Sequence, residues 1–205
     1  SFLGFMNQLY SKGTFGGFVR NQPGYGNMYA AVLAMLQTGY REKDNNDNIF
    51  GAELGLNKVP WCALFYHWIV KQLKDVRPDM VYDYNFDAKY SNSRYMFERA
   101  PESTRQLSEI RPGYAVVWAR NNNTVKPVTG PGMNKRAGHT GVCVYNDPSK
   151  KLIIIAEGNS RDGVHLIARY WRNINSRNLE FVGGCTYIKP DADFRYVLPR
   201  EGSWS

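Results

Sequence analysis

The spacing of hydrophobic and polar positions changes about halfway along the chain. In the first half, apolar side chains recur at helical spacing, whereas the second half contains short β-branched and aromatic runs separated by turn residues such as "NDPSK" and "SRDG". The runs predict five strands, at residues 113–119, 138–146, 151–159, 163–171 and 179–188. Strands that short turns join are antiparallel, so helices followed by such a sheet predict the α+β class.

The first half of the chain predicts one central helix and several peripheral ones. A first helix is predicted from Asn27 to a stop at Gly39, and residues 79–111 predict an irregular segment with one or two short helices, at 91–100 and 103–110. The central helix follows Asn57, a plausible N-cap, and Pro60, which suits a first helical turn. Residues 59–70 are nearly all apolar, and a helix that is hydrophobic on every side is buried. Cys62 lies in its first turn.

The sequence divides into one domain with an extension at each end. Residues 1–26 mix glycine with aromatic residues and predict an arm or linker, residues 27–190 hold the predicted domain, and residues 191–205 form a tail. A basic insertion rich in Gly and Pro, at 120–138, separates the first two strands, and loops of that length are usually functional or disordered. The chain starts at Ser1 without a signal-peptide pattern, so we expect a fragment, a processed product or an excised domain.

The composition indicates a globular chain with an anionic partner. Hydrophobic residues make up 43% of the 205 residues, and no apolar run reaches the roughly 18 residues of a membrane span, so we expect no span. A net charge of +8 favours nucleic acid, a membrane surface or the acidic polymers of a bacterial wall. Lys and Arg are scattered and no nucleic-acid-binding motif is present, so we expect no nucleic acid partner.

Cys62 is the candidate nucleophile, because a thiol at a helix N-terminus beside a histidine has a lowered pKa. The alternative is a structural role, because many free cysteines only fill space in the core. The chain has three histidines. His67 lies about 140° around the helix from Cys62, which is more typical of a core or surface residue. His165 alternates with an apolar set and is predicted to point to solvent with Arg169. His139 begins a strand among small residues and is the best partner for Cys62.

Two further sets of residues leave alternatives open. Glu157 ends a run of isoleucines, where it either contacts solvent at the sheet edge or accepts a hydrogen bond that fixes the tautomer of the histidine. Cys143 and Cys185 form a disulfide only if an oxidising compartment and a suitable strand geometry coincide. Three widely spaced cysteines are too few for a zinc ribbon.

Four segments, in this order, resemble those of a known family: "PWCALFYHWIV", "RPGYAVVWAR", "AGHTGVCVY" and "IIAEGNSRDG". They are similar to the CHAP family of cysteine- and histidine-dependent amidohydrolases and peptidases, papain-like relatives of the NlpC/P60 enzymes. The resemblance implies a papain-like fold, with N-terminal helices packed on a roughly five-stranded antiparallel sheet, and catalysis by Cys62, His139, Glu157 and Asn159. It also implies a peptidoglycan substrate outside the cytoplasm, cut either at the amide between sugar and stem peptide or at a peptide bond.

The resemblance implies no cofactor, although some related enzymes bind calcium near an acidic loop before the cysteine. Residues 44–55 depart from the EF-hand pattern, with Ile49 at its glycine position and Gly55 at its glutamate position, so we expect no calcium site. The resemblance fits a phage lysin, a virion-associated hydrolase, a secreted hydrolase, or an effector delivered into competitors, which would have an immunity protein as partner. The alternative function is an idle module of the same fold that binds the wall or belongs to a phage or secretion assembly.

Overall fold

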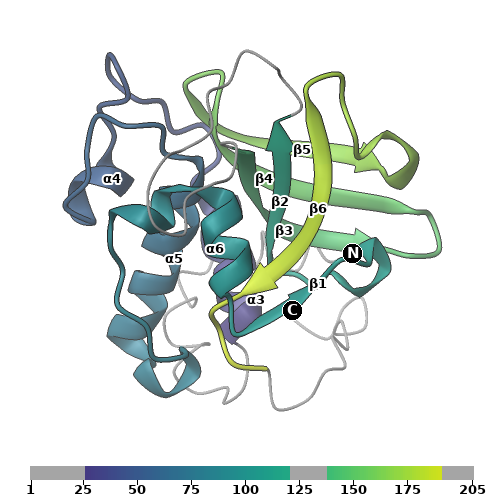
Figure 1. The fold of residues 1–205 in the computed structure, drawn as a ribbon, viewed down its shortest axis with the longest axis horizontal. Helices are drawn as coiled ribbons and strands as arrows, with labels where there is room; N and C mark the ends of the chain where they lie inside the picture. Colours follow the sequence, from purple (N-terminus) through teal and green to yellow (C-terminus); the bar gives the residue numbers. More distant parts are fainter. Residues whose placement is uncertain (1–25, 121–137, 191–205) are drawn as a thin grey trace, which may run out of the picture.

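The computed structural model describes residues 26–120 and 138–190, which form an antiparallel sheet with helices on one side of it (Figure 1). The α-helices are α3 (Gly26–Leu36), α4 (Ile49–Glu53), α5 (Cys62–Val76) and α6 (Ser93–Arg99). The strands are β1 (Glu102–Thr104), β2 (Ala115–Arg120), β3 (Gly138–Asp147), β4 (Leu152–Ser160), β5 (Gly163–Tyr170) and β6 (Leu179–Thr186). Short 3-10 helices cover Pro78–Met80, Ala88–Ser91, Leu107–Glu109 and Trp171–Asn173. This is the α+β arrangement that the change of spacing predicts.

The sheet has six strands, so the prediction of five is wrong. Their order is β1-β6-β2-β3-β4-β5, and every neighbouring pair is antiparallel. The additional strand, β1, overlaps the start of the segment 103–110 that was expected to be helical, and it pairs with the end of β6, with Glu102 opposite Thr186. A strand of three residues is too short to show a period of two, so tertiary pairing decides its structure.

The side chains of the sheet divide between two cores. Val117 and Val142 belong to the larger core, which the sheet forms with α3, α5 and α6. Trp118 and Ile155 belong to a smaller core on the other face, which Ile174 helps to close. Successive strand residues point to opposite faces, so β2, β3 and β4 are buried on both sides where they supply both cores.

Helix α5 is the central helix, as its apolar run predicts. Every residue from Cys62 to Val70 is buried, and the helix contacts α3, α4, α6, β3 and β4. Its N-cap is Trp61, whereas Asn57, the expected cap, accepts a hydrogen bond from the backbone N–H of Asn48. The helix therefore begins later than expected, with Cys62 as its first residue.

The prediction of which face of β5 is buried holds at Val164, which is fully buried in the larger core, but is wrong for the rest of the strand. Leu166 and Tyr170 are 36% and 47% exposed, whereas Arg169 points inward, on the face of His165, and pairs with Glu157. β5 is an edge strand and is not among the strands that pack closely on the helices. A buried carboxylate without a partner is costly, so the pairing of Glu157 outweighs the burial of two apolar side chains.

Several predictions concern residues outside the described ones. The arm at 1–26 and the insertion at 120–138 lie outside them except for their end residues, and the tail at 191–205 lies outside them entirely. Within the described ranges, no helix combines the length and the apolar character that crossing a membrane requires.

Candidate active site

Cys62 stands at the start of α5, which its neighbours hold in place. The Trp61 indole is fully buried, stacks on Phe50 and donates its Nε1–H to Oε2 of Glu42 at 2.5 Å. Glu42 also accepts a hydrogen bond from the backbone N–H of Asn46, so the acidic loop before α5 anchors the start of the helix. Unpaired N–H groups at a helix start form a positive end, which stabilises a thiolate.

His139 is the second residue of β3 and lies opposite Trp118 of β2. The centroids of the two rings are 5.6 Å apart, which restricts the imidazole. His139 Nε2 is hydrogen-bonded to Oε1 of Glu157 at 2.8 Å. Because the imidazole is also hydrogen-bonded to the Cys62 thiol, Nδ1 is the nitrogen left for that contact. The fold thus brings a thiol, an imidazole and a carboxylate together from α5, β3 and β4.

Two glycines allow this close approach. Gly141 is opposite Glu157 in the sheet, and a Cβ atom on it would lie 2.9 Å from Cγ of Glu157. A Cβ atom on Gly158 would lie 2.8 Å from Cβ of Phe65 in α5. Both distances are shorter than Cβ contacts in proteins, so β3, β4 and α5 approach this closely because glycine stands at both positions.

The three groups shift one another's protonation. Burial by itself raises the pKa of Cys62, but the hydrogen bond and charge of His139, with the backbone N–H groups of Thr140 and Ala63, outweigh burial and lower that pKa. Burial lowers the pKa of His139, but hydrogen bonds to Cys62 and Glu157 and their charges outweigh it and raise this pKa to about 9. The two shifts together favour the thiolate–imidazolium pair over a neutral thiol beside a neutral imidazole.

Glu157 has a second partner, Arg169, which the sequence patterns alone did not predict. Burial raises the pKa of Glu157, whose side chain is 2% exposed, but His139 and Arg169 outweigh burial and lower it. Arg169 Nη2 lies 2.8 Å from Oε2 of Glu157. A signal in the sequence exists, because a buried carboxylate requires a cation and Arg169 is the one Lys or Arg in the neighbouring strand.

Asn159, the fourth expected site residue, lies apart from these hydrogen bonds. It is half-buried near the end of β4, where the register shifts, and its φ of 54° is a conformation that asparagine tolerates. The Nε2 atom of His139 is bonded to Glu157 instead. Direct hydrogen bonds thus join three of the four expected residues.

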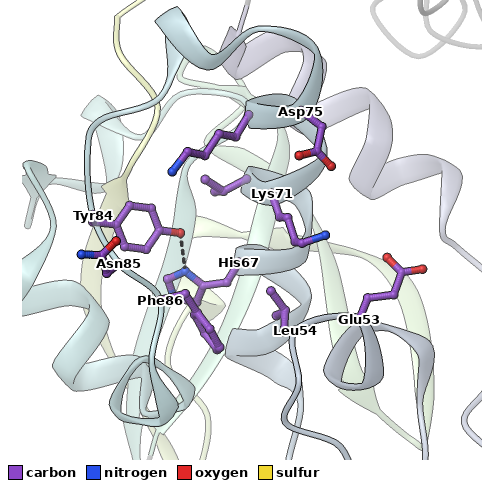
Figure 2. A pocket seen from close by; sticks show the side chains of 10 residues that line it. Glu53, Leu54, His67, Lys71, Asp75, Tyr84, Asn85 and Phe86 are labelled. Atoms are coloured by element: carbon purple, nitrogen blue, oxygen red, sulfur yellow. Dashed lines mark hydrogen bonds between the residues drawn. The ribbon is translucent and has the colours of Figure 1, made fainter.

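His67 belongs to a different part of α5. The sequence left a core or a surface position open for it, and its 1% exposure places it in the core. Figure 2 shows its ring beside Tyr84, whose hydroxyl lies 2.9 Å from His67 Nδ1. Burial lowers the pKa of His67 to about 3, so this imidazole stays neutral. The pocket in this view is also lined by Lys71 and Asp75, and Cys62 is not among its lining residues.

The other two cysteines are free and buried. Cys143 belongs to the core on one face of the sheet and Cys185 to the core on the other, so the geometry excludes a disulfide between them. Burial raises the pKa of both thiols, so Cys62 is the one cysteine among the described residues whose pKa is lowered. Within residues 26–120 and 138–190, no group of three or more His, Cys, Asp or Glu side chains is placed to hold a metal ion.

Comparison with known proteins gives a distant similarity. Neither a protein-family model nor a curated protein matches the sequence. A solved structure, NlpC2 from Trichomonas vaginalis, is similar with a TM-score of 0.48 and 12% sequence identity. The likeness covers 80% of this chain and 48% of NlpC2, so the chain spans about half the length of that protein. A likeness of this size does not identify a function, which is therefore inferred from the geometry of the site.

Proposed function

We propose that the protein is a cysteine-dependent hydrolase that cleaves an amide bond of peptidoglycan. The observation that supports this best is the set of contacts between Cys62, His139 and Glu157, with the pKa of the thiol lowered and that of the imidazole raised. A cysteine hydrolase requires a thiolate, a proton donor beside it, and an acceptor that orients the donor. A papain-like fold, with the nucleophile at the start of a helix beside a sheet, is part of the proposal.

In the first step, the Cys62 thiolate attacks the carbonyl carbon of the amide and a C–S bond forms. His139 gives its proton to the amide nitrogen, the C–N bond breaks, and the amine leaves. The backbone N–H of Cys62, at the positive end of α5, donates a hydrogen bond to the oxygen that becomes negative. The product of this step is a thioester on Cys62.

In the second step, His139 takes a proton from a water molecule, and the water oxygen attacks the thioester. The C–S bond breaks, the carboxylic acid leaves, and the thiolate and imidazolium are restored. Glu157 holds Nε2 of His139 throughout and stabilises the positive charge of the ring. Asn159 is assigned, on the resemblance to the CHAP family, to the same orienting group.

Peptidoglycan is proposed as the substrate on the resemblance to the CHAP family and on the charge of the chain. A net charge of +8 complements the acidic polymers of bacterial walls, which are proposed as secondary partners. The enzyme would then act outside the cytoplasm. The chemistry requires no cofactor, and the bond is either the sugar–peptide amide or a peptide bond.

Release of dye from labelled peptidoglycan tests the proposal. The wild type should release dye, and Cys62→Ala and His139→Ala, folded by circular dichroism, should lose at least about a hundredfold in rate. Lys71→Ala, an exposed position on the same helix, is the matched control and should keep the wild-type rate. Full activity in either site variant would refute the proposal, and binding of the wild type to the wall without release would favour the idle module.

A further inference from the structure

Arg169 binds the carboxylate oxygen of Glu157 that His139 does not use. Its Nε and Nη2 atoms both donate to Oε2, at 3.1 and 2.8 Å, whereas Oε1 is bonded to Nε2 of His139 at 2.8 Å. Each oxygen of the carboxylate therefore has its own partner. Charge-assisted hydrogen bonds of this kind are short and strong, so the carboxylate cannot rotate without breaking them.

Glu157 lies where a carboxylate would otherwise take up a proton. Its side chain is 2% exposed, and burial disfavours the charged form. Among the described residues, the ionisable groups around the pair of Glu157 and His139 are Cys62 from α5, and His165 and Arg169 from β5. His165 is opposite Glu157 in the sheet, but its buried Nε2 has no hydrogen-bond partner there. Arg169 therefore supplies the permanent positive charge at Glu157 in the described structure.

Arg169 is itself held by the aromatic ring that contacts His139. Its guanidinium carbon lies 5.5 Å from the centroid of the Trp118 ring, and the same indole packs against the imidazole of His139. The indole is fixed because its Nε1–H donates to the backbone oxygen of Ile174 at 2.9 Å. The contacts thus close a ring from Arg169 through Trp118 and His139 to Glu157.

We propose that Arg169 is a positioning residue, which keeps Glu157 ionised and directs its Oε1 atom to His139. This inference rests on the proposed function, and it gives Arg169 an indirect role, because its contacts are with Glu157 and the Trp118 ring. Arg169 is not among the main causes of the shifted pKa of Cys62 or of His139, and its hydrogen bonds go to Glu157, so it acts through that carboxylate. Arg169 lowers the pKa of Glu157, so without Arg169 the ionised carboxylate, and the thiolate–imidazolium pair that it supports, appears only at a higher pH.

The rate at which iodoacetamide alkylates Cys62 reports the thiolate without any wall substrate. Peptide mass spectrometry follows this rate from about pH 4 to about pH 8. The acid limb is the part of the plot of alkylation rate against pH where the rate rises as the thiolate forms. In Arg169→Met, this limb should shift to higher pH by about one unit, so that alkylation at a given pH on the limb is about tenfold slower. Arg169→Lys keeps the positive charge but places it on a single nitrogen, so it should shift the acid limb less than half as far as Arg169→Met does. Arg172→Met, an exposed arginine that packs on Tyr170, is the matched control and should leave the limb in place.

A double variant shows whether Arg169 acts through Glu157. In the Glu157→Gln background, Arg169→Met should move the limb no further, because the carboxylate through which it acts is gone. An unmoved limb in folded Arg169→Met, or a further movement in the double variant, overturns the inference. If Arg169→Met does not fold, Arg169→Gln, which has no charge but can still donate a hydrogen bond to Glu157, takes its place, and an unmoved limb in that variant overturns the inference. A wild type whose Cys62 reacts no faster than an ordinary thiol would instead contradict the proposed function.

Discussion

Replacement of Glu157 by Gln tests the electrostatic partnership within the site. Gln keeps the size of the side chain and removes its charge, which is one cause of the raised pKa of His139. That pKa is about 9, compared with 6.5 for an ordinary histidine, and the difference corresponds to about 3 kcal/mol. Burial lowers the pKa of His139, so Cys62 and Glu157 together must stabilise the imidazolium by at least about 3 kcal/mol. If they contribute about equally, Glu157→Gln loses about 1–2 kcal/mol and lowers the pKa of His139 by about one unit.

Nuclear magnetic resonance of protein with carbon-13-labelled histidine measures this pKa. The chain has three histidines, and burial of His67 lowers its pKa to about 3, so its signal does not titrate near neutral pH. The signal of His139 is identified by its loss in His139→Ala. We expect its midpoint in Glu157→Gln to lie about one pH unit below that of the wild type, and Lys71→Ala to match the wild type. Equal midpoints in Glu157→Gln and the wild type would refute the reasoning, because Glu157 would then not stabilise the imidazolium.

Three further predictions concern packing, the anchoring of α5, and metal. Gly158→Ala places a methyl group 2.8 Å from Cβ of Phe65 and should lower the free energy of unfolding in urea by about 1–3 kcal/mol; an unchanged value would show that β4 and α5 separate freely. Glu42→Gln weakens the hydrogen bond of the buried Trp61 indole and should cost about 1 kcal/mol in the same assay, and wild-type stability would contradict the anchoring. A chelator should leave dye release unchanged, whereas a loss that calcium restores would contradict a metal-free mechanism.

The sheet and the central helix could be predicted because their patterns extend over many residues. The alternating runs fall close to β2 through β6, and the apolar run from 59 to 70 marks α5 with Cys62 in its first turn. β1 has only three residues, and its pairing with β6 decides its structure. The start of α5 is later than expected because Asn57 bonds to the loop before the helix and does not cap it.

The site could be predicted only in part, and β5 shows the reason. Cys62 and His139 stand out because a thiol at a helix start and a histidine among small residues are chemically distinctive. Alternation in β5 shows which residues share a face, but it does not show which face is inside. The apolar set that includes Leu166 is therefore easily taken for the core face. The buried carboxylate of Glu157 decides the matter, since it draws Arg169 inward.

The mass spectrum of purified peptidoglycan after digestion tests the central proposal most directly. The wild type should produce fragments that have gained one water molecule at an amide bond, and the new amine and carboxyl termini should identify that bond. Cys62→Ala should produce none of these fragments. The same fragments from Cys62→Ala, or unchanged peptidoglycan after treatment with the wild type, would contradict the proposal that Cys62 is the nucleophile of a peptidoglycan hydrolase.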